Sequence, residues 1–145
     1  MLVHTPPGFG VIPLWVYDER MATRQITTDG FEDVVAKEGI VLLDFWAAWC
    51  PPCRAFGPVF EKSSETHTDI VFGKVDTEAE GALAGSFEIT SIPTLMAFRD
   101  GIIVFSQPGA LNAPQLERVI TAVRDLDMDD VRAQIAAHEA KEAAK

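Results

Sequence analysis

The stretch that decides the fold is Ile40-Val41-Leu42-Leu43-Asp44-Phe45-Trp46-Ala47-Ala48-Trp49-Cys50-Pro51-Pro52-Cys53. Its first seven residues are apolar apart from one carboxylate, which is typical of a strand that is covered on both faces. After the second cysteine, Phe56, Val59 and Phe60 recur at helical spacing. The sequence therefore predicts a buried strand over 40–46, a short loop, and a helix that begins at the first cysteine.

Composition and charge limit the classes of protein to which the chain can belong. Its 145 residues suit one domain, and an apolar content of 48% excludes a disordered chain. The net charge of −10 argues against a nucleic-acid binder, because such binding depends on phosphate contacts. No stretch is long and apolar enough to span a bilayer, so we expect no membrane partner either.

Both ends of the chain extend beyond the strongly patterned region. Prolines and glycines interrupt residues 1–21, which predicts an irregular extension, and a translation start at Met21 would remove most of it. This segment lacks a basic leader and a clear cleavage pattern, so we expect no signal peptide and a cytoplasmic protein. Residues 127–144 predict one more helix, with Val131 and Ile135 as its main apolar anchors.

Strands and helices alternate between these ends. We expect further strands over residues 23–27, 70–76, 95–98 and 102–105. We expect helices from Thr28 or Asp29 to Gly39, over residues 78–86, and from Asn112 onward. The turn Arg99-Asp100-Gly101 is of a type that joins neighbouring antiparallel strands. Asn112 precedes Gln115 by three residues, which is the pattern of an N-terminal capping box.

The two cysteines are the only ones in the chain, and they stand three residues apart. A zinc site is one interpretation, but it needs four ligands, and His4, His67 and His138 are scattered. A structural disulfide is a second interpretation, but closing so short a loop removes little chain entropy. A redox-active dithiol fits better, because a strand precedes the pair and a helix follows it. We expect His67 simply to point to water.

Cys50 is predicted at the helix N-cap, where free amides and the positive end of the helix lower the pKa of a thiol. The resulting thiolate is the nucleophile that attacks a disulfide in a target. We expect Cys50 to be accessible and Cys53, one turn further on, to lie deeper. Pro51 and Pro52 have no amide hydrogen to offer the sulfur, so the N–H of Cys53 should matter more.

Asp44 needs an explanation, because an isolated buried carboxylate is costly. Either its side chain reaches water or a cap at the strand end, or it is a buried acid of raised pKa that accepts the proton of Cys53. Lys74, on an adjacent strand, is either its counter-charge or an exposed lysine at a strand end. Pro93 lies in a loop, and the sequence alone does not predict a cis bond before it.

These motifs resemble those of the thioredoxin family in order and in spacing. The resemblance rests on the residues Asp44 to Cys53, Pro58, Lys74, Ser91-Ile92-Pro93-Thr94, Gly101 and Gly109-Ala110. It implies an α/β thioredoxin fold, in which a central mixed β-sheet is flanked by helices, here with an extra C-terminal helix. We therefore expect a thioredoxin domain over 22–125, preceded by the extension 1–21 and followed by the additional helix in 126–145.

The resemblance also implies a role for individual residues. Cys50 would attack the target and Cys53 would resolve the mixed disulfide. Asp44 and Lys74 would form a buried proton-transfer pair, while a cis Pro93 would face the thiols. The backbone of Ile92 would pair with a target peptide. The apolar docking surface would consist of Trp49, Pro51, Pro52, Ile92, Gly109 and Ala110.

The implied activity is that of a protein-disulfide reductase with no bound cofactor or metal. Its electrons would come from NADPH through a flavin-dependent thioredoxin reductase, and its targets would be enzymes such as peroxiredoxins and ribonucleotide reductase. We expect a monomer. Two residues depart from the family pattern: Pro51 replaces the usual glycine, and Pro108 precedes Gly109. Pro51 leaves the reduction potential open, and Pro108 leaves the target range open. Two alternatives therefore remain: a disulfide oxidant or isomerase of the same fold, and a redox-inactive docking module.

Overall fold

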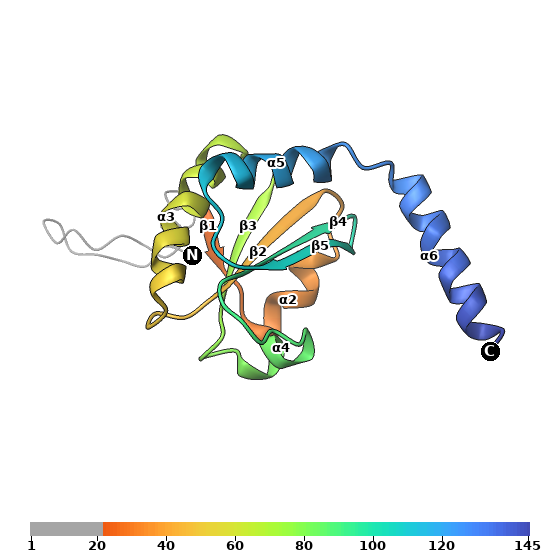
Figure 1. The fold of residues 1–145 in the computed structure, drawn as a ribbon, viewed down its shortest axis with the longest axis horizontal. Coiled ribbons are helices and arrows are strands. Elements are labelled where there is room, and N and C mark those ends of the chain that lie inside the picture. Colours follow the sequence, from red (N-terminus) through yellow and green to blue (C-terminus); the bar gives the residue numbers. More distant parts are fainter. Residues whose placement is uncertain (1–21) are drawn as a thin grey trace, which may run out of the picture.

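The computed structural model describes residues 22–145, so the extension predicted over residues 1–21 lies outside the described residues. A five-stranded sheet forms its centre, with the strand order β1-β3-β2-β4-β5 (Figure 1). The strands are β1 (Thr23–Gln25), β2 (Ile40–Trp46), β3 (Val71–Asp76), β4 (Thr94–Arg99) and β5 (Ile102–Pro108). Strand β3 is parallel to β1 and β2, whereas β4 is antiparallel to β2 and to β5. The predicted mixed sheet is confirmed.

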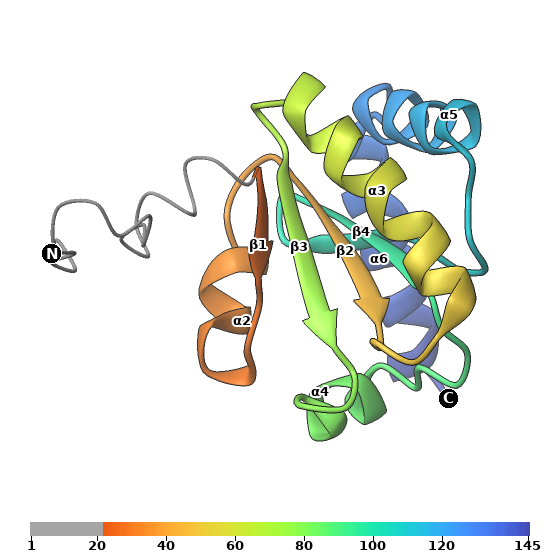
Figure 2. The same ribbon diagram turned by 90° about the vertical axis from the view of Figure 1, so that its left-hand side faces the viewer.

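Helices cover both faces of this sheet. They are α2 (Thr28–Val35), α3 (Pro51–Thr66), α4 (Gly81–Ser86), α5 (Ala113–Arg124) and α6 (Met128–Ala143). Figure 2 shows α3 and α5 on one side of the sheet, with α2 and α4 away from them. Helix α6 follows α5 and extends beyond the sheet (Figure 1). The architecture is the predicted helix-flanked sheet with an extra C-terminal helix.

Strand β2 lies at the centre of two apolar clusters, as its continuous hydrophobicity predicts. Val41, Leu43 and Phe45 pack in the cluster that contains side chains of α2 and α4. Leu42, on the opposite face, packs in the cluster that contains side chains of α3 and α5. Because side chains alternate along a strand, Asp44 belongs to the same face as Leu42. The carboxylate is thereby placed under the helix that carries the cysteines.

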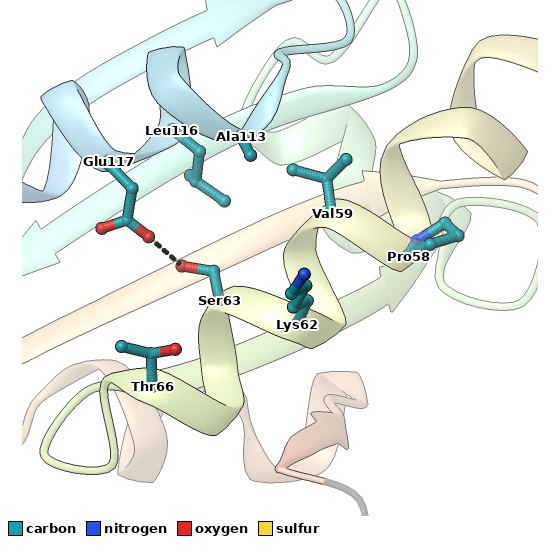
Figure 3. Close-up of a pocket in the computed structure, with 8 residues that line it drawn as sticks. All are labelled: Pro58, Val59, Lys62, Ser63, Thr66, Ala113, Leu116 and Glu117. Carbon is teal, nitrogen blue, oxygen red and sulfur yellow. Dashed lines mark hydrogen bonds between the residues drawn. The ribbon is translucent and has the colours of Figure 1, made fainter.

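Helices α3 and α5 are joined by polar contacts as well as by apolar packing. Figure 3 shows the groove between them, of about 330 Å³, where Ser63 donates a hydrogen bond of 3.1 Å to Glu117. His67 Nε2 lies 2.7 Å from the second Glu117 oxygen, and Arg124 lies 3.1 Å from His67 Nδ1. The expectation that His67 points to water is therefore wrong, because the packing of α5 on α3 brings two charged partners to it.

Several predicted boundaries also differ from the observed ones. Helix α2 follows Thr27 and ends at Val35, not at Gly39, which has a φ of +97° in the turn before β2. The capping box of α5 is present as predicted. In α6 the buried residue is Met128, while Ile135 is 37% exposed, so the expected anchors were incomplete.

Candidate active site

The first cysteine stands where the loop after β2 enters helix α3. Cys50 is the N-cap residue, with φ −90° and ψ 110°, and two prolines follow it in the first turn. Its Sγ accepts a hydrogen bond of 3.2 Å from the backbone N–H of Cys53. The helix therefore begins where the sequence predicts, and the amide of Cys53 is the donor that reaches the sulfur.

Cys50 and Cys53 form a disulfide, with their Cα atoms 5.2 Å apart. Cys50 is only 2% exposed and Cys53 is 4% exposed. The expectation of an accessible Cys50 above a deeper Cys53 is thus wrong for this oxidised state, because Ala47, Trp46 and Ile92 pack against the pair. Trp49, the residue before the disulfide, is in contrast 63% exposed.

Asp44 is a buried acid, not a strand-end residue that reaches water. It is 0% exposed, and neither carboxylate oxygen has a hydrogen-bond partner among residues 22–145. Desolvation raises the pKa of Asp44 from 3.8 to about 7, although the positive charge of Lys74 opposes the rise. A carboxyl group with this pKa can bind and release a proton near neutral pH, as a general base requires.

Lys74 lies on β3 at the position paired with Asp44 on β2. Its charge acts on the carboxylate through space, since within the described part of the chain Lys74 makes no ion pair at 4.0 Å or less. Its Nζ lies 4.9 Å from the ring centre of Trp46, a distance typical of a cation–π contact. A cleft of about 420 Å³ is lined by Trp46, Cys53, Glu61 and Lys74 among others. This cleft opens the Cys53 side of the site to solvent.

The loop before β4 contacts the disulfide from the other side. The bond between Ile92 and Pro93 is cis, as the family resemblance implies. The carbonyl oxygen of Ile92 lies 3.7 Å from Cys50 Sγ. The N–H of Gly109 donates a hydrogen bond of 2.8 Å to the carbonyl of Pro93. The end of β5 is thereby held next to the loop that touches the first sulfur.

The predicted docking residues lie in these same loops and in the first turn of α3. Ile92 is half-buried, and the others are exposed: Trp49, Pro51, Pro52, Gly109 and Ala110. Ile92 packs against the cysteines, and Gly109 bonds to Pro93, the next residue in that loop. Ala110 follows Gly109 in the chain and points to solvent.

Glu78 and Trp46 also belong to the site, although no sequence motif pointed to them. The indole N–H of Trp49 donates a hydrogen bond of 2.5 Å to Glu78 Oε1, which fixes the exposed ring beside the disulfide. Trp46 packs against the cysteines, and its Nε1 is buried without a partner among residues 22–145. The contact between Trp49 and Glu78 could have been inferred from the expected parallel strands. Trp49 follows β2 and Glu78 follows β3, and residues that follow two neighbouring parallel strands meet at one edge of the sheet.

Comparison with known proteins identifies the family. The family model named Thioredoxin matches residues 22–122. The chain belongs to the thioredoxin family. A putative thioredoxin 2 of Streptomyces coelicolor is 51% identical over 120 residues, which cover 83% of this chain and 90% of that relative. The thioredoxin of Mycobacterium tuberculosis is 38% identical over 107 residues, which cover 72% of this chain and 92% of the relative.

Solved thioredoxin structures agree with the fold. Plasmodium falciparum thioredoxin superposes with a TM-score of 0.65 at 32% identity, covering 69% of this chain and 98% of that one. The thioredoxin of Malassezia sympodialis has the same TM-score at 31% identity, covering 79% of this chain and 96% of that one.

Membership in the thioredoxin family fixes the reaction class. The chain is a thiol–disulfide oxidoreductase of the protein-disulfide reductase type, and thioredoxins work through a redox-active disulfide with no bound cofactor. Within residues 22–145 no three His, Cys, Asp or Glu side chains are grouped to hold a metal ion. The helices described for this thioredoxin-family chain include none with the length and hydropathy needed to cross a membrane.

Proposed function

We propose that this chain carries electrons from NADPH, through a flavin-dependent thioredoxin reductase, to disulfides of target proteins in the cytoplasm. Cys50 is the attacking cysteine and Cys53 the resolving one. The proposal rests on two observations. A disulfide lies at the N-cap of α3, and the buried carboxyl group of Asp44, on the strand beneath that helix, has a pKa of about 7.

The reaction consists of two exchanges. In the first, the thiolate of Cys50 attacks one sulfur of the target disulfide, which breaks that bond and releases the other target sulfur as a thiolate. A disulfide between Cys50 and the target remains. In the second, the thiolate of Cys53 attacks the sulfur of Cys50, which releases the remaining target sulfur and forms the Cys50–Cys53 disulfide. Two electrons pass to the target, and the reductase restores the dithiol.

The second exchange requires that Cys53 lose its proton. We assign this step to Asp44, because a carboxyl group that titrates near neutrality can accept a proton from a thiol. Lys74 favours the ionised carboxylate, since its charge lowers the pKa of Asp44. The cleft that Cys53 shares with Lys74 offers the proton a route to solvent.

Targets dock on the exposed residues around the disulfide. Trp49 supplies the largest apolar surface there, at 63% exposure, and Glu78 holds its ring. The backbone of Ile92 pairs with an extended target segment, which brings the target sulfur to Cys50. Peroxiredoxins and ribonucleotide reductase are examples of the disulfide-containing enzymes that we expect as targets.

We assign the catalytic unit to residues 22–125 and treat residues 126–145, which contain α6, as an addition to it. Residues 1–21 are a further extension. We expect the unit to act as a monomer. Both cysteines and the buried acid belong to one chain, so the proposed reaction needs no residue from a second copy.

Insulin reduction with NADPH and a thioredoxin reductase tests the proposed function. NADPH consumption that depends on the chain, and that is lost in Cys50→Ser, would support it. Turnover with dithiothreitol but none with the reductase would reject the proposed electron source. A reduction potential near the value of about −120 mV known for strong disulfide oxidants would favour the oxidant or isomerase alternative. Activity no greater than that of free dithiol would favour the docking module.

A further inference from the structure

Strand β5 forms one edge of the sheet, and it pairs with β4 alone. On its outer side, the backbone of Ile102–Pro108 makes no hydrogen bond within residues 22–145. A row of unpaired N–H and C=O groups at a sheet edge is a template for the addition of another strand. This edge carries no lysine, arginine, aspartate or glutamate. Its register against β4 shifts between Ala97 and Phe98, and it ends at Pro108, so an added strand would pair regularly with part of β5.

Helix α6 turns this edge into one wall of a groove of about 430 Å³. The apolar side chains that line it, which define the β5–α6 groove, are Ile102, Ile103, Val104, Leu126, Val131 and Ile135. The exposed large apolar side chains among residues 22–145 are Trp49, Ile103 and Ile135. Trp49 belongs to the active site, so the β5–α6 groove is a second place where apolar surface meets solvent.

The α6 wall is poorly supported by the rest of the domain. Met128 is its buried residue, and Arg132 reaches Asp100 in the β4–β5 turn at 3.5 Å. Most of the stability of a helix in a protein comes from the packing of its apolar face. The apolar face of α6, with Val131 and Ile135 one turn apart, is directed into the groove and is left partly open.

We propose that the β5–α6 groove binds a basic, strand-forming segment of a client protein. The segment adds to β5 as a sixth strand and packs its apolar side chains against α6. A strand fits because the free groups of β5 are backbone donors and acceptors in strand geometry. This inference rests on the proposed function, since the client is a protein whose disulfide the chain reduces.

Charge decides the chemistry of the partner. The whole chain carries a net charge of −10, and Glu139 is the carboxylate that lines the groove. A second copy in the groove would bring two strongly acidic chains together, which their mutual repulsion opposes. Lysine and arginine side chains on an added strand would instead meet an acidic surface.

The groove is connected to the active site by β5 itself. Ile102 lies at the groove, whereas Pro108 at the other end pairs with Thr94 and is followed by Gly109, which bonds Pro93. At about 3.4 Å per residue, the strand covers roughly 20 Å between these two ends. A client held along β5 would therefore extend toward the loop that contacts Cys50, and the groove would raise the local concentration of its disulfide.

The test uses the full oxidised chain and a fluorescent peptide of alternating valine and lysine, with a peptide of alternating valine and glutamate as control. We expect the basic peptide to bind and to slow hydrogen exchange of alternate β5 amides, which is the pattern of strand addition. Ile103→Asn and Ile135→Asn, one from each wall, should each weaken binding by about tenfold. Ala133→Asn, on α6 outside the groove lining, should bind normally.

Several results would overturn the proposal. Equal binding of the acidic peptide would remove the charge argument, and binding without protection of β5 amides would exclude strand addition. A dimer in sedimentation velocity that Ile103→Asn abolishes would assign the groove to a second copy. Amide signals of residues 1–21 that move in Ile103→Asn would assign it to the chain's own N-terminal segment. Insulin reduction measured on the same variants should stay unchanged, which separates a failure here from a failure of the proposed function.

Discussion

Replacing Asp44 by asparagine should leave the stability nearly unchanged below about pH 4, stabilise the folded chain increasingly as the pH rises to about 7, and keep that gain at higher pH. Burial raises the pKa of Asp44 from 3.8 to about 7. Between these two values the folded chain retains a proton that the unfolded chain has lost. With respect to Asp44, the folded chain is therefore most stable in acid, where this carboxyl is neutral in both the folded and the unfolded state. This stability is lost as the pH rises from 3.8 to about 7.

The size of the effect follows from the pKa. Each unit of difference corresponds to about 1.36 kcal/mol, so ionised Asp44 costs the fold on the order of 4 kcal/mol above pH 7. The charge of Lys74 is already included, because it lowers the same pKa. The side chains of asparagine and of neutral aspartic acid have similar shapes, and both would be buried without a hydrogen-bond partner. This cost therefore cancels when the variant is compared with the wild type. Asp44→Asn should accordingly unfold roughly 13 °C higher than the wild type in mild alkali.

Guanidinium unfolding of the oxidised proteins at about pH 4, 7 and 8.5 measures this difference directly. The matched control is Asp33→Asn, which changes an exposed carboxylate on α2 and should keep the pH profile of the wild type. Parallel stability profiles for Asp44→Asn and the wild type would refute the raised pKa. The proton-transfer role that depends on this pKa would fall with it.

Three further substitutions test other parts of the account. Cys53→Ser should leave the target attached to Cys50 and abolish sustained insulin turnover, and mass spectrometry should detect the mixed disulfide. Rapid turnover would reject the two-step scheme. His67→Ala should lower the free energy of unfolding by about 1 kcal/mol, because it removes a partner from both Glu117 and Arg124; unchanged stability would show that these contacts contribute nothing. Gly109→Ala should lower the free energy of unfolding by roughly 1–2 kcal/mol, because a φ of +107° is strained for alanine. If calorimetry finds no loss of stability, the turn relaxes without strain.

Local patterns in the sequence predicted the elements around the active site. The apolar run predicted β2 with its observed bounds. A strand that is covered on both faces is apolar along nearly its whole length, so the ends of the run mark the ends of the strand. The start of α3 at the cysteines and the capping box of α5 followed from side chains that act within one turn. These features need no knowledge of distant parts of the chain.

Features that depend on tertiary packing were missed or left open. The contacts of His67 with Glu117 join residues 50 positions apart, and the bond from Trp49 to Glu78 joins two loops that meet through strand pairing. The sequence left two interpretations of Asp44, and only its burial in the fold decides between them. The low exposure of Cys50 depends on a loop around Ile92, which lies about forty residues away, as the Cys50–Ile92 contact shows.

The proposed reaction requires that Cys50 of the reduced chain be held as a reactive thiolate at the start of α3. The most direct measurement is the rate of alkylation of Cys50 by iodoacetamide as a function of pH, in Cys53→Ser so that one sulfur reports. We expect a half-maximal rate at least one pH unit below the ordinary cysteine pKa of about 8.5, with reaction in the folded state. A half-maximal rate at or above that value, or a sulfur that reacts only after unfolding, would contradict it.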